Sequence, residues 1–320
     1  MLTQTLIISS LATLIAAEKR EGEAGNVIHH SKSHMNFLSM QPRIIGGAET
    51  PVDRYPYAVS LQSTQHFCGA TIIAPDVLFT AAHCAIIDFS DVTAVIGSHD
   101  LEGKTPSGDG TVDKVPPVRV YVHPEYDAST NENDFALVFL PRPTTAGVEY
   151  VRLNSDPEFP SQADVLTAMG WGDTTVEDGY DLSDVLLGVD LDYIPNDVCD
   201  ASSDGIDTYQ GLVKDSMICA SKSGRDGCQG DSGGPIIVKG SDHTKDVQVG
   251  VSSWGYGCAS PDFPGVYSRV SNGYRWIRNR VCRRSVDPPE WFDCWKKKSL
   301  ALRFAINGKN GGGKKKSGPP

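Results

Sequence analysis

Short strand-like runs, separated by turns rich in glycine and proline, constrain this chain more than any other feature of its sequence. The runs are rich in Val, Ile, Phe and Tyr and lack the hydrophobic period of an amphipathic helix. Examples lie at 57–62, 71–74, 77–82, 93–98, 118–122, 135–140, 165–172, 235–240, 247–255 and 265–270. Many short strands joined by such turns predict a β-sandwich or a β-barrel. One helix is expected near the end of this region, in "SNGYRWIRNRVC", with Ser271 as its N-cap.

The composition fits a folded protein with an uneven distribution of charge. Hydrophobic residues make up 39% of the 320 residues, enough to bury a sizeable core, and 22% are charged, which argues against global disorder. Residues 44–282 contain 34 acids and 15 Lys/Arg, whereas residues 283–320 contain 10 Lys/Arg and 3 acids. We therefore expect a body that favours cationic partners and does not bind nucleic acid. A basic extension, partly disordered, follows it and favours anionic partners.

The first 43 residues have the composition of segments that are removed from a mature protein. Residues 1–17 are apolar from Leu6 onward, end in small residues and are short for a bilayer span, which is typical of a secretory signal peptide. A buried strand or helix is the alternative interpretation. Residues 18–43 are polar and rich in histidine, so we interpret them as a propeptide. No later segment is apolar over the length of a membrane span, and we expect a secreted, extracellular protein.

Eight cysteines follow the predicted signal peptide. They are Cys68, Cys84, Cys199, Cys219, Cys228, Cys258, Cys282 and Cys294. An even number of cysteines in a secreted chain predicts four disulfides, although the sequence alone leaves their pairing open. A metal site is the alternative, but no closely spaced Cys-x-x-Cys pair supports one. We expect no metal ion and no cofactor.

The segment "GRDGCQGDSGGP" (224–235) surrounds Ser232 with glycines. A serine hydroxyl is a weak nucleophile unless a base takes its proton. The glycines let the backbone follow a tight path that aims the amides of Gly230 and Ser232 at one point. Two such amides would hold the oxyanion that forms on a scissile carbonyl, each contributing about 3 kcal/mol. The segment therefore predicts a nucleophile with an oxyanion hole.

Two further residues complete the predicted chemistry. His83 lies in "FTAAHC" and is the candidate base, and Asp134 in "NENDFALVFL" stands just before an apolar run. A carboxylate buried at that point would orient an imidazole. Taken singly, a lone histidine is more often structural and a lone aspartate before a strand is usually a turn residue. Together, in the order His, Asp, Ser, they predict a catalytic triad.

Over residues 44–282 the chain resembles the trypsin/chymotrypsin family of serine endopeptidases. The matching motifs are "RIIGG" (43–47), "TAAHC" (80–84), "NDFAL" (133–137), "GWG" (170–172), "DGCQGDSGGP" (226–235), "SSWGYGC" (252–258) and "PGVYSRV" (264–270). The resemblance implies an all-β fold of two antiparallel six-stranded β-barrels, with the active-site cleft between them and a short C-terminal helix. It also implies peptide-bond hydrolysis by Ser232, with His83 as the general base and Asp134 as the group that orients it.

The resemblance further implies a substrate-binding pocket. Asp226, six residues before Ser232, matches the base of the pocket, where a carboxylate selects Arg or Lys in the substrate. The remaining pocket residues implied by the family are Gly227, Ser253, Trp254, Gly255 and Gly265. Gly227 stands where many trypsins have a serine, from which we predict a preference for Arg over Lys.

Activation and disulfide pairing follow from the same resemblance. It implies a zymogen that is cleaved between Arg43 and Ile44, after which the new ammonium group of Ile44 pairs with Asp231. It also implies the disulfides Cys68–Cys84, Cys199–Cys219 and Cys228–Cys258. Cys282 and Cys294 then remain as a fourth pair, which is not a usual bridge of the family.

The expected partners are peptide or protein substrates with Arg or Lys and protein protease inhibitors, and we expect a monomer. Calcium is not expected, because Ser98 stands where a ligand carboxylate would be needed. Two alternative functions remain. One is a catalytically silent protease homologue that acts as a binding module. The other is a serine esterase, but esterases tend to use Gly-x-Ser-x-Gly on an α/β fold, and the many strands here argue against it.

Overall fold

The computed structural model describes most of the chain after the predicted propeptide. The described residues are 46–107, 110–174, 181–223, 230–258 and 260–294. Contacts divide the chain into two units, residues 1–40 and 41–320, and all described residues belong to the second. The predicted signal peptide (1–17) and propeptide (18–43) lie outside the described residues, so their boundaries stay predictions.

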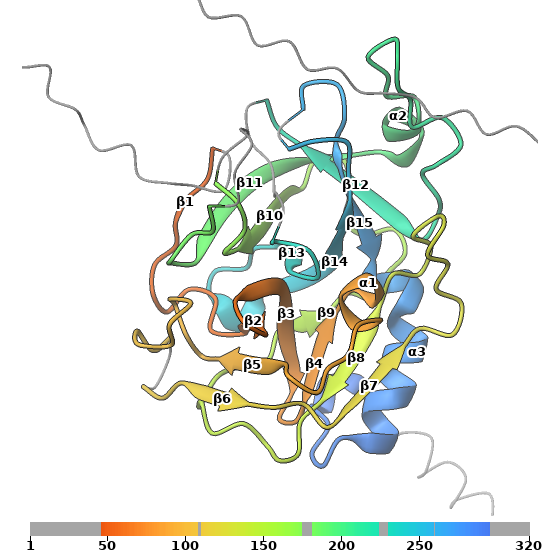
Figure 1. Cartoon of the computed structure of the whole chain (residues 1–320). Helices are drawn as coiled ribbons and strands as arrows, with labels where there is room; N and C mark the ends of the chain where they lie inside the picture. Colours follow the sequence, from red (N-terminus) through yellow and green to blue (C-terminus); the bar gives the residue numbers. More distant parts are fainter. Residues whose placement is uncertain (1–45, 108–109, 175–180, 224–229, 259, 295–320) are drawn as a thin grey trace, which may run out of the picture. The chain divides into compact units, whose positions relative to one another are not determined.

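The first half of the second unit forms an antiparallel sheet of seven strands (Figure 1). They are β2 (Ala58–Gln62), β3 (His66–Ala74), β4 (Val77–Thr80), β5 (Thr93–Ile96), β6 (Asp113–Val115), β7 (Arg119–Val122) and β8 (Ala136–Phe139). Their order is β6-β5-β2-β3-β4-β8-β7, so the two edge strands are consecutive in the chain. Pro116 and Pro117 separate these edges and, lacking an N–H, cannot continue a hydrogen-bonded ladder. The sheet therefore curls into a half-barrel whose edges are joined covalently.

The second half contains a closed barrel. Its six strands are β10 (Val165–Gly170), β11 (Leu187–Ile194), β12 (Met217–Ser221), β13 (Pro235–Val238), β14 (Val247–Trp254) and β15 (Gly265–Arg269). It closes because β11 pairs with both β10 and β12. Two short strands add to it, β1 (Ala48–Glu49) on β11 and β9 (Arg152–Leu153) on β14. The predicted all-β fold and short C-terminal helix are confirmed. Of the two predicted six-stranded barrels, the second is closed, and the first is the curled sheet of seven strands.

The helices in the described residues are few and short. They are α1 (Ala82–Ala85), α2 (Asn196–Asp200), α3 (Val270–Arg284) and the 3-10 turns η1 (His243–Lys245) and η2 (Glu290–Phe292). The predicted helix near the end of the domain is α3, but the predicted N-cap is wrong. Arg269 holds the N-cap position without a side-chain hydrogen bond, and Ser271 lies inside the first turn, where its hydroxyl cannot cap. No described helix is long and apolar enough to cross a membrane.

Three of the four predicted disulfides are confirmed: Cys68–Cys84, Cys199–Cys219 and Cys282–Cys294. Cys258 is disulfide-bonded as well, but its predicted partner Cys228 lies outside the described residues.

The polypeptide continues beyond α3 as an ordered segment that folds back on the helix. The Cys282–Cys294 disulfide ties its end to α3, and the Phe292 ring is fully buried, facing Tyr274 at 6.3 Å between ring centroids. Arg278 donates hydrogen bonds to the carbonyls of Phe292 and Asp293. Burial of one large apolar side chain contributes about 1.5–3 kcal/mol. Residues 285–294 are therefore an integral part of the folded unit.

Candidate active site

His83 and Asp134 meet at one end of the curled sheet because the strands that carry them are paired. In the β4–β8 ladder Thr80 lies opposite Ala136, so the residues just after β4 and just before β8 emerge together. His83 Nδ1 lies 2.7 Å from Asp134 Oδ2, and the His83 backbone amide donates to Asp134 Oδ1 at 2.9 Å. Asp134 is fully buried, whereas the imidazole is 27% exposed. The predicted pairing of these two side chains is thus present in the structure.

A third donor to Asp134 comes from the other barrel. The hydroxyl of Ser253, on β14, donates to Asp134 Oδ2 at 2.6 Å. The sequence had assigned Ser253 only to the substrate pocket, and its bond to Asp134 was missed, because the two residues are 119 positions apart. A buried carboxylate is costly unless its oxygens accept hydrogen bonds. Here three donors, two from His83 and one from Ser253, supply them.

Ser232 lies in the loop that leads into β13, beside the same sheet end. The Gly69 amide donates to the Ser232 carbonyl at 2.8 Å, and the Gly233 amide donates to the Ser252 carbonyl at 2.9 Å, so both halves of the protein anchor this loop. Gly233 has a φ of 77°, and a Cβ there would collide with Thr80 Oγ1. Only glycine allows such a close approach with this backbone conformation. The glycine-rich motif therefore brings half-buried Ser232 up to the strand end that precedes His83.

Asp231, next to Ser232, is buried against the "GWG" motif. The Gly172 amide donates to Asp231 Oδ1 at 2.9 Å, and a Cβ at Gly170 or Gly172 would collide with the carboxylate. The two glycines are therefore needed to admit Asp231 into the interior. Its predicted partner, the amino group of Ile44, lies outside the described residues, as does Arg43.

His66 contacts the loop that carries Gly230 and Ser232, a role that the sequence did not predict. Its Nε2 lies 2.8 Å from the Gly230 carbonyl and its Nδ1 lies 2.7 Å from Ser60 Oγ. Burial lowers the pKa of His66 to about 4, against the opposing effect of the Gly230 hydrogen bond. A neutral ring that donates from Nε2 to a carbonyl must accept at Nδ1, so Ser60 donates to it. The only sequence signal was its place two residues before Cys68.

Comparison with known proteins decides the family. The family model described as Trypsin matches residues 44–277, most of the chain. The chain belongs to the trypsin family. Trypsin epsilon of Drosophila erecta is 38% identical over 239 residues, which cover 73% of this chain and 86% of that protein. Trypsin-1 of Gadus morhua is 35% identical over 247 residues (75% and 92%), and Hypodermin-B of Hypoderma lineatum is 36% identical over 238 residues (73% and 86%). These matches make the protein a serine protease, a hydrolase.

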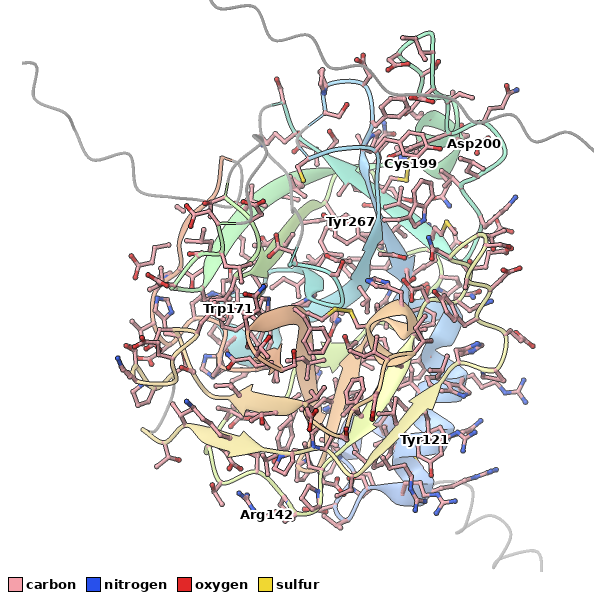
Figure 2. All side chains as sticks on the ribbon, in the orientation of Figure 1. Tyr121, Arg142, Trp171, Cys199, Asp200 and Tyr267 are labelled. Atoms are coloured by element: carbon pink, nitrogen blue, oxygen red, sulfur yellow. A yellow bond between two sulfur atoms is a disulfide. The ribbon has the colours of Figure 1, made fainter. Side chains whose placement is uncertain are left out.

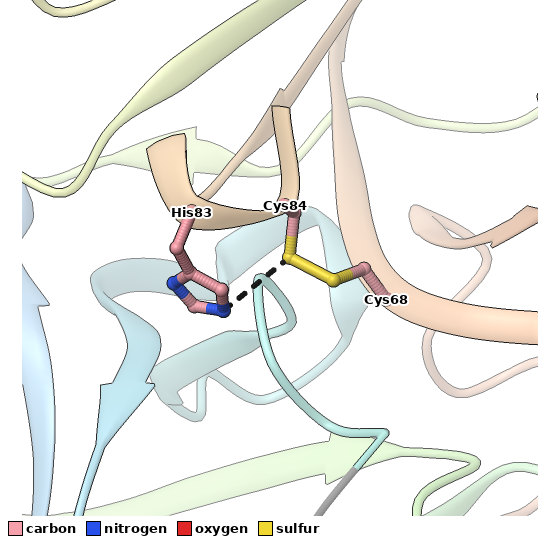
Figure 3. A group of neighbouring side chains, drawn as sticks. All are labelled: Cys68, His83 and Cys84. Carbon is pink, nitrogen blue, oxygen red and sulfur yellow. Dashed lines mark hydrogen bonds between the residues drawn. A yellow bond between two sulfur atoms is a disulfide. The ribbon is translucent and has the colours of Figure 1, made fainter. Parts of the chain in front are cut away.

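The sulfur atoms beside His83 do not form a metal site in this trypsin-family chain. Figure 3 shows His83 Nε2 facing Cys84 Sγ, at 3.5 Å, with Cys84 bonded to Cys68. Metal ligation requires a thiolate, and disulfide sulfurs are not thiolates.

Within the described part of the chain, His83 Nε2 makes no hydrogen bond to Ser232 Oγ. Such catalytic hydrogen bonds are often long in the free enzyme and tighten when substrate binds.

The predicted pocket is only partly within the described residues. Asp226 and Gly227 lie outside them. Gly255 and Gly265 lie close together, because a Cβ on Gly255 would be 3.8 Å from the Gly265 Cα. The Trp254 ring contacts Tyr209 at 4.9 Å between centroids. Neither glycine places a side chain between these two strand ends, which lie beside the ring of Tyr209.

Proposed function

We propose that this trypsin-family serine protease is a secreted endopeptidase that cleaves after Arg or Lys through Ser232, His83 and Asp134. The observation that carries the proposal is the His83–Asp134 pair, with three hydrogen bonds on the buried carboxylate, beside the loop that holds Ser232. An imidazole fixed in this way presents Nε2 as a base toward a neighbouring hydroxyl.

Each step of the proposed reaction uses a group in this arrangement. Ser232 Oγ attacks the scissile carbonyl while His83 Nε2 takes its proton, and the Asp134 carboxylate stabilises the imidazolium that results. The amides of Gly230 and Ser232 hold the oxyanion of the tetrahedral intermediate. His83 then returns the proton to the leaving amine, which leaves an acyl-enzyme on Ser232. Water, deprotonated by His83, attacks the ester and regenerates the serine.

The proposed specificity depends on Asp226 at the base of the pocket. A carboxylate in a narrow slot favours a long cationic side chain, and Arg binds it in a bidentate manner. The close glycine pair, Gly255 and Gly265, supports this proposal because neither residue has a side chain that would block the way in. With Gly227 beside Asp226, we propose that Arg is preferred over Lys.

The proposed activation is cleavage between Arg43 and Ile44 in a secreted precursor. The buried position of Asp231, which is 3% exposed and lies next to Ser232, supports a role as the acceptor of the new Ile44 ammonium group. That pair would order the loop carrying the amides of Gly230 and Ser232. Leaving either charge without its partner costs about 3–5 kcal/mol. We propose a mature monomer that protein protease inhibitors bind.

Profiling on a peptide library tests the activity. Protein cleaved at Arg43 should react with a fluorophosphonate at Ser232 and cut only after Arg and Lys. Asp226→Ser should lose this preference by about 100-fold or more, because the cation loses its charged hydrogen-bond partner. The matched control, Asp204→Ser, removes an exposed carboxylate elsewhere and should leave the preference for Arg and Lys unchanged. A sample that neither reacts nor cuts would instead indicate a catalytically silent homologue.

Arg43→Gln tests activation separately. The variant should be secreted uncut and have nearly no activity, since no Ile44 ammonium group forms. Full activity of the uncut variant would refute the activation step and leave the triad proposal standing.

A further inference from the structure

Helix α3 is basic throughout, in contrast to the body of the protein. Its 15 residues contain no acid and five arginines: Arg275, Arg278, Arg280, Arg283 and Arg284. Acids outnumber Lys and Arg by 34 to 15 over residues 44–282. The positive charge of α3 is therefore a local feature of this surface.

Strand β7 adds a further arginine to one side of α3. Arg280 and Arg284 are four residues apart and share a helix face, and Arg119 and Tyr121 are two apart and share a strand face. The Arg280 guanidinium lies over the Tyr121 ring at 4.6 Å, and Arg119 Nη1 donates to Tyr121 Oη at 3.2 Å. Figure 2 shows Tyr121 beside α3. We call Arg119, Arg280 and Arg284 the arginine cluster.

The arginine cluster has no carboxylate partner among the described residues. The ordered ion pairs of other arginines show the contrast: Arg54 pairs with Asp246 and Arg142 with Asp113. The hydrogen bond from Arg119 lowers the pKa of Tyr121, and the positive charges of Arg119, Arg284 and Arg280 lower it further. Like charges held close together repel one another, and an anion bound between them would relieve that repulsion.

We propose that the arginine cluster binds a sulfated polysaccharide. Guanidinium groups bind tetrahedral oxyanions in a bidentate manner, and a polymer offers several such anions at once. The residues that follow Cys294 contain eight Lys/Arg and no acid, and the Cys282–Cys294 disulfide fixes their starting point at the end of α3.

An anionic membrane fits the same surface less well. Peripheral membrane segments insert exposed apolar side chains below the headgroups. Here the exposed apolar side chains next to the cluster in the sequence are two small ones, Val118 and Val286, and the large Phe292 ring after α3 is fully buried. A long nucleic acid would meet the acidic surface of the body.

Calorimetric titration of the full chain with heparin, at about 50 mM salt, tests the proposal. The triple variant R119Q/R280Q/R284Q should bind about tenfold more weakly, because each exposed pair of a guanidinium and an anion contributes up to about 1 kcal/mol. The matched control, K214Q/K222Q/K245Q, removes the same charge from residues outside α3 and β7 and should bind heparin as the unaltered chain does. Equal Tm values verify that both variants fold.

Four results would overturn the proposal. They are no binding to heparin, equal binding to uncharged dextran, equal losses in the two triple variants, and tighter binding to phosphatidylserine vesicles than to heparin. Binding does not require proteolysis, so peptide cleavage by the same samples separates this proposal from the proposed function.

Discussion

Two carboxylates, Asp134 and Asp246, are both fully buried but are held in different ways. Asp246 pairs with the Arg54 guanidinium and also accepts hydrogen bonds from Tyr57 Oη at 2.6 Å and from the Gly240 amide at 2.8 Å. Asp134 accepts hydrogen bonds from His83 and Ser253 and has no arginine or lysine partner within the described chain.

The difference distinguishes a structural ion pair from the pair that we propose to be catalytic. The hydrogen bond to Asp246 raises the pKa of Arg54, so the guanidinium stays charged at every physiological pH. Burial, together with the charge of Asp246, raises the pKa of Tyr57 well above its ordinary value, and its hydroxyl stays a donor. The partner of Asp134 is an imidazole, whose charge can change during a reaction. We therefore expect mutations at Asp134 to affect activity and mutations at Asp246 to affect stability.

The largest expected effect is on activity. Asp134→Asn should lower kcat by about 10⁴-fold, a size already established for this family, because the amide favours the wrong histidine tautomer. Stability should change little, since the amide fills the same space. Steady-state kinetics and urea unfolding of one sample measure both. A fall in stability that accounts for the lost activity would contradict the comparison.

The next effect is on stability. Asp246→Asn should lower the free energy of unfolding by about 3–5 kcal/mol, because it leaves Arg54 partly buried without its counter-charge. The kcat of the folded fraction should stay unchanged. Urea unfolding combined with active-site titration measures both quantities. A reduced kcat per titrated site would contradict the prediction that Asp246 affects stability alone.

A third prediction concerns pH and His66. Its folded pKa of about 4 lies below its ordinary value of 6.5, so the unfolded chain binds the extra proton first as the pH falls. The stability contribution is complete above pH 6.5 and is lost between pH 6.5 and 4, by about 3 kcal/mol in total. Urea unfolding across this range should show a steeper loss for the unaltered protein than for His66→Asn. Parallel curves of unfolding free energy against pH for the two proteins would refute the prediction.

The smallest effects come from a matched pair of hydroxyl deletions. Ser253→Ala removes one donor from Asp134 and should lower kcat by about tenfold, because a hydrogen bond to a charged group contributes about 1.5–3 kcal/mol. Tyr57→Phe removes one donor from Asp246 and should lower stability by a similar free energy with unchanged kcat. Reversed outcomes for the two variants would break the comparison.

The strand-like runs quoted from the sequence overlap ten of the fifteen described strands and miss β1, β6, β9, β11 and β12. Strand β11 alternates buried Leu187, Val189 and Leu191 with outward acids, which lowers its apparent strand propensity. The structure shows why the acids are tolerated: Asp190 pairs with Lys239 on the outside of the barrel.

The same limit applies to the site. Motifs predicted a triad of His83, Asp134 and Ser232, because each stands in a distinctive local sequence. The hydrogen bond from Ser253 to Asp134 and the bond between His66 and Gly230 join residues 119 and 164 positions apart. No local pattern encodes such contacts, which only the fold creates.

The segment that folds back on α3 has a practical consequence for anyone who shortens this chain. The family match ends at residue 277, inside the helix. A chain that ends at residue 282 would leave Cys282 without its disulfide partner and would remove Phe292 from the ring of Tyr274. The free thiol of Cys282 could form a disulfide between two molecules, and the exposed aromatic surface would favour aggregation. A soluble, correctly oxidised recombinant enzyme should therefore extend at least through Cys294.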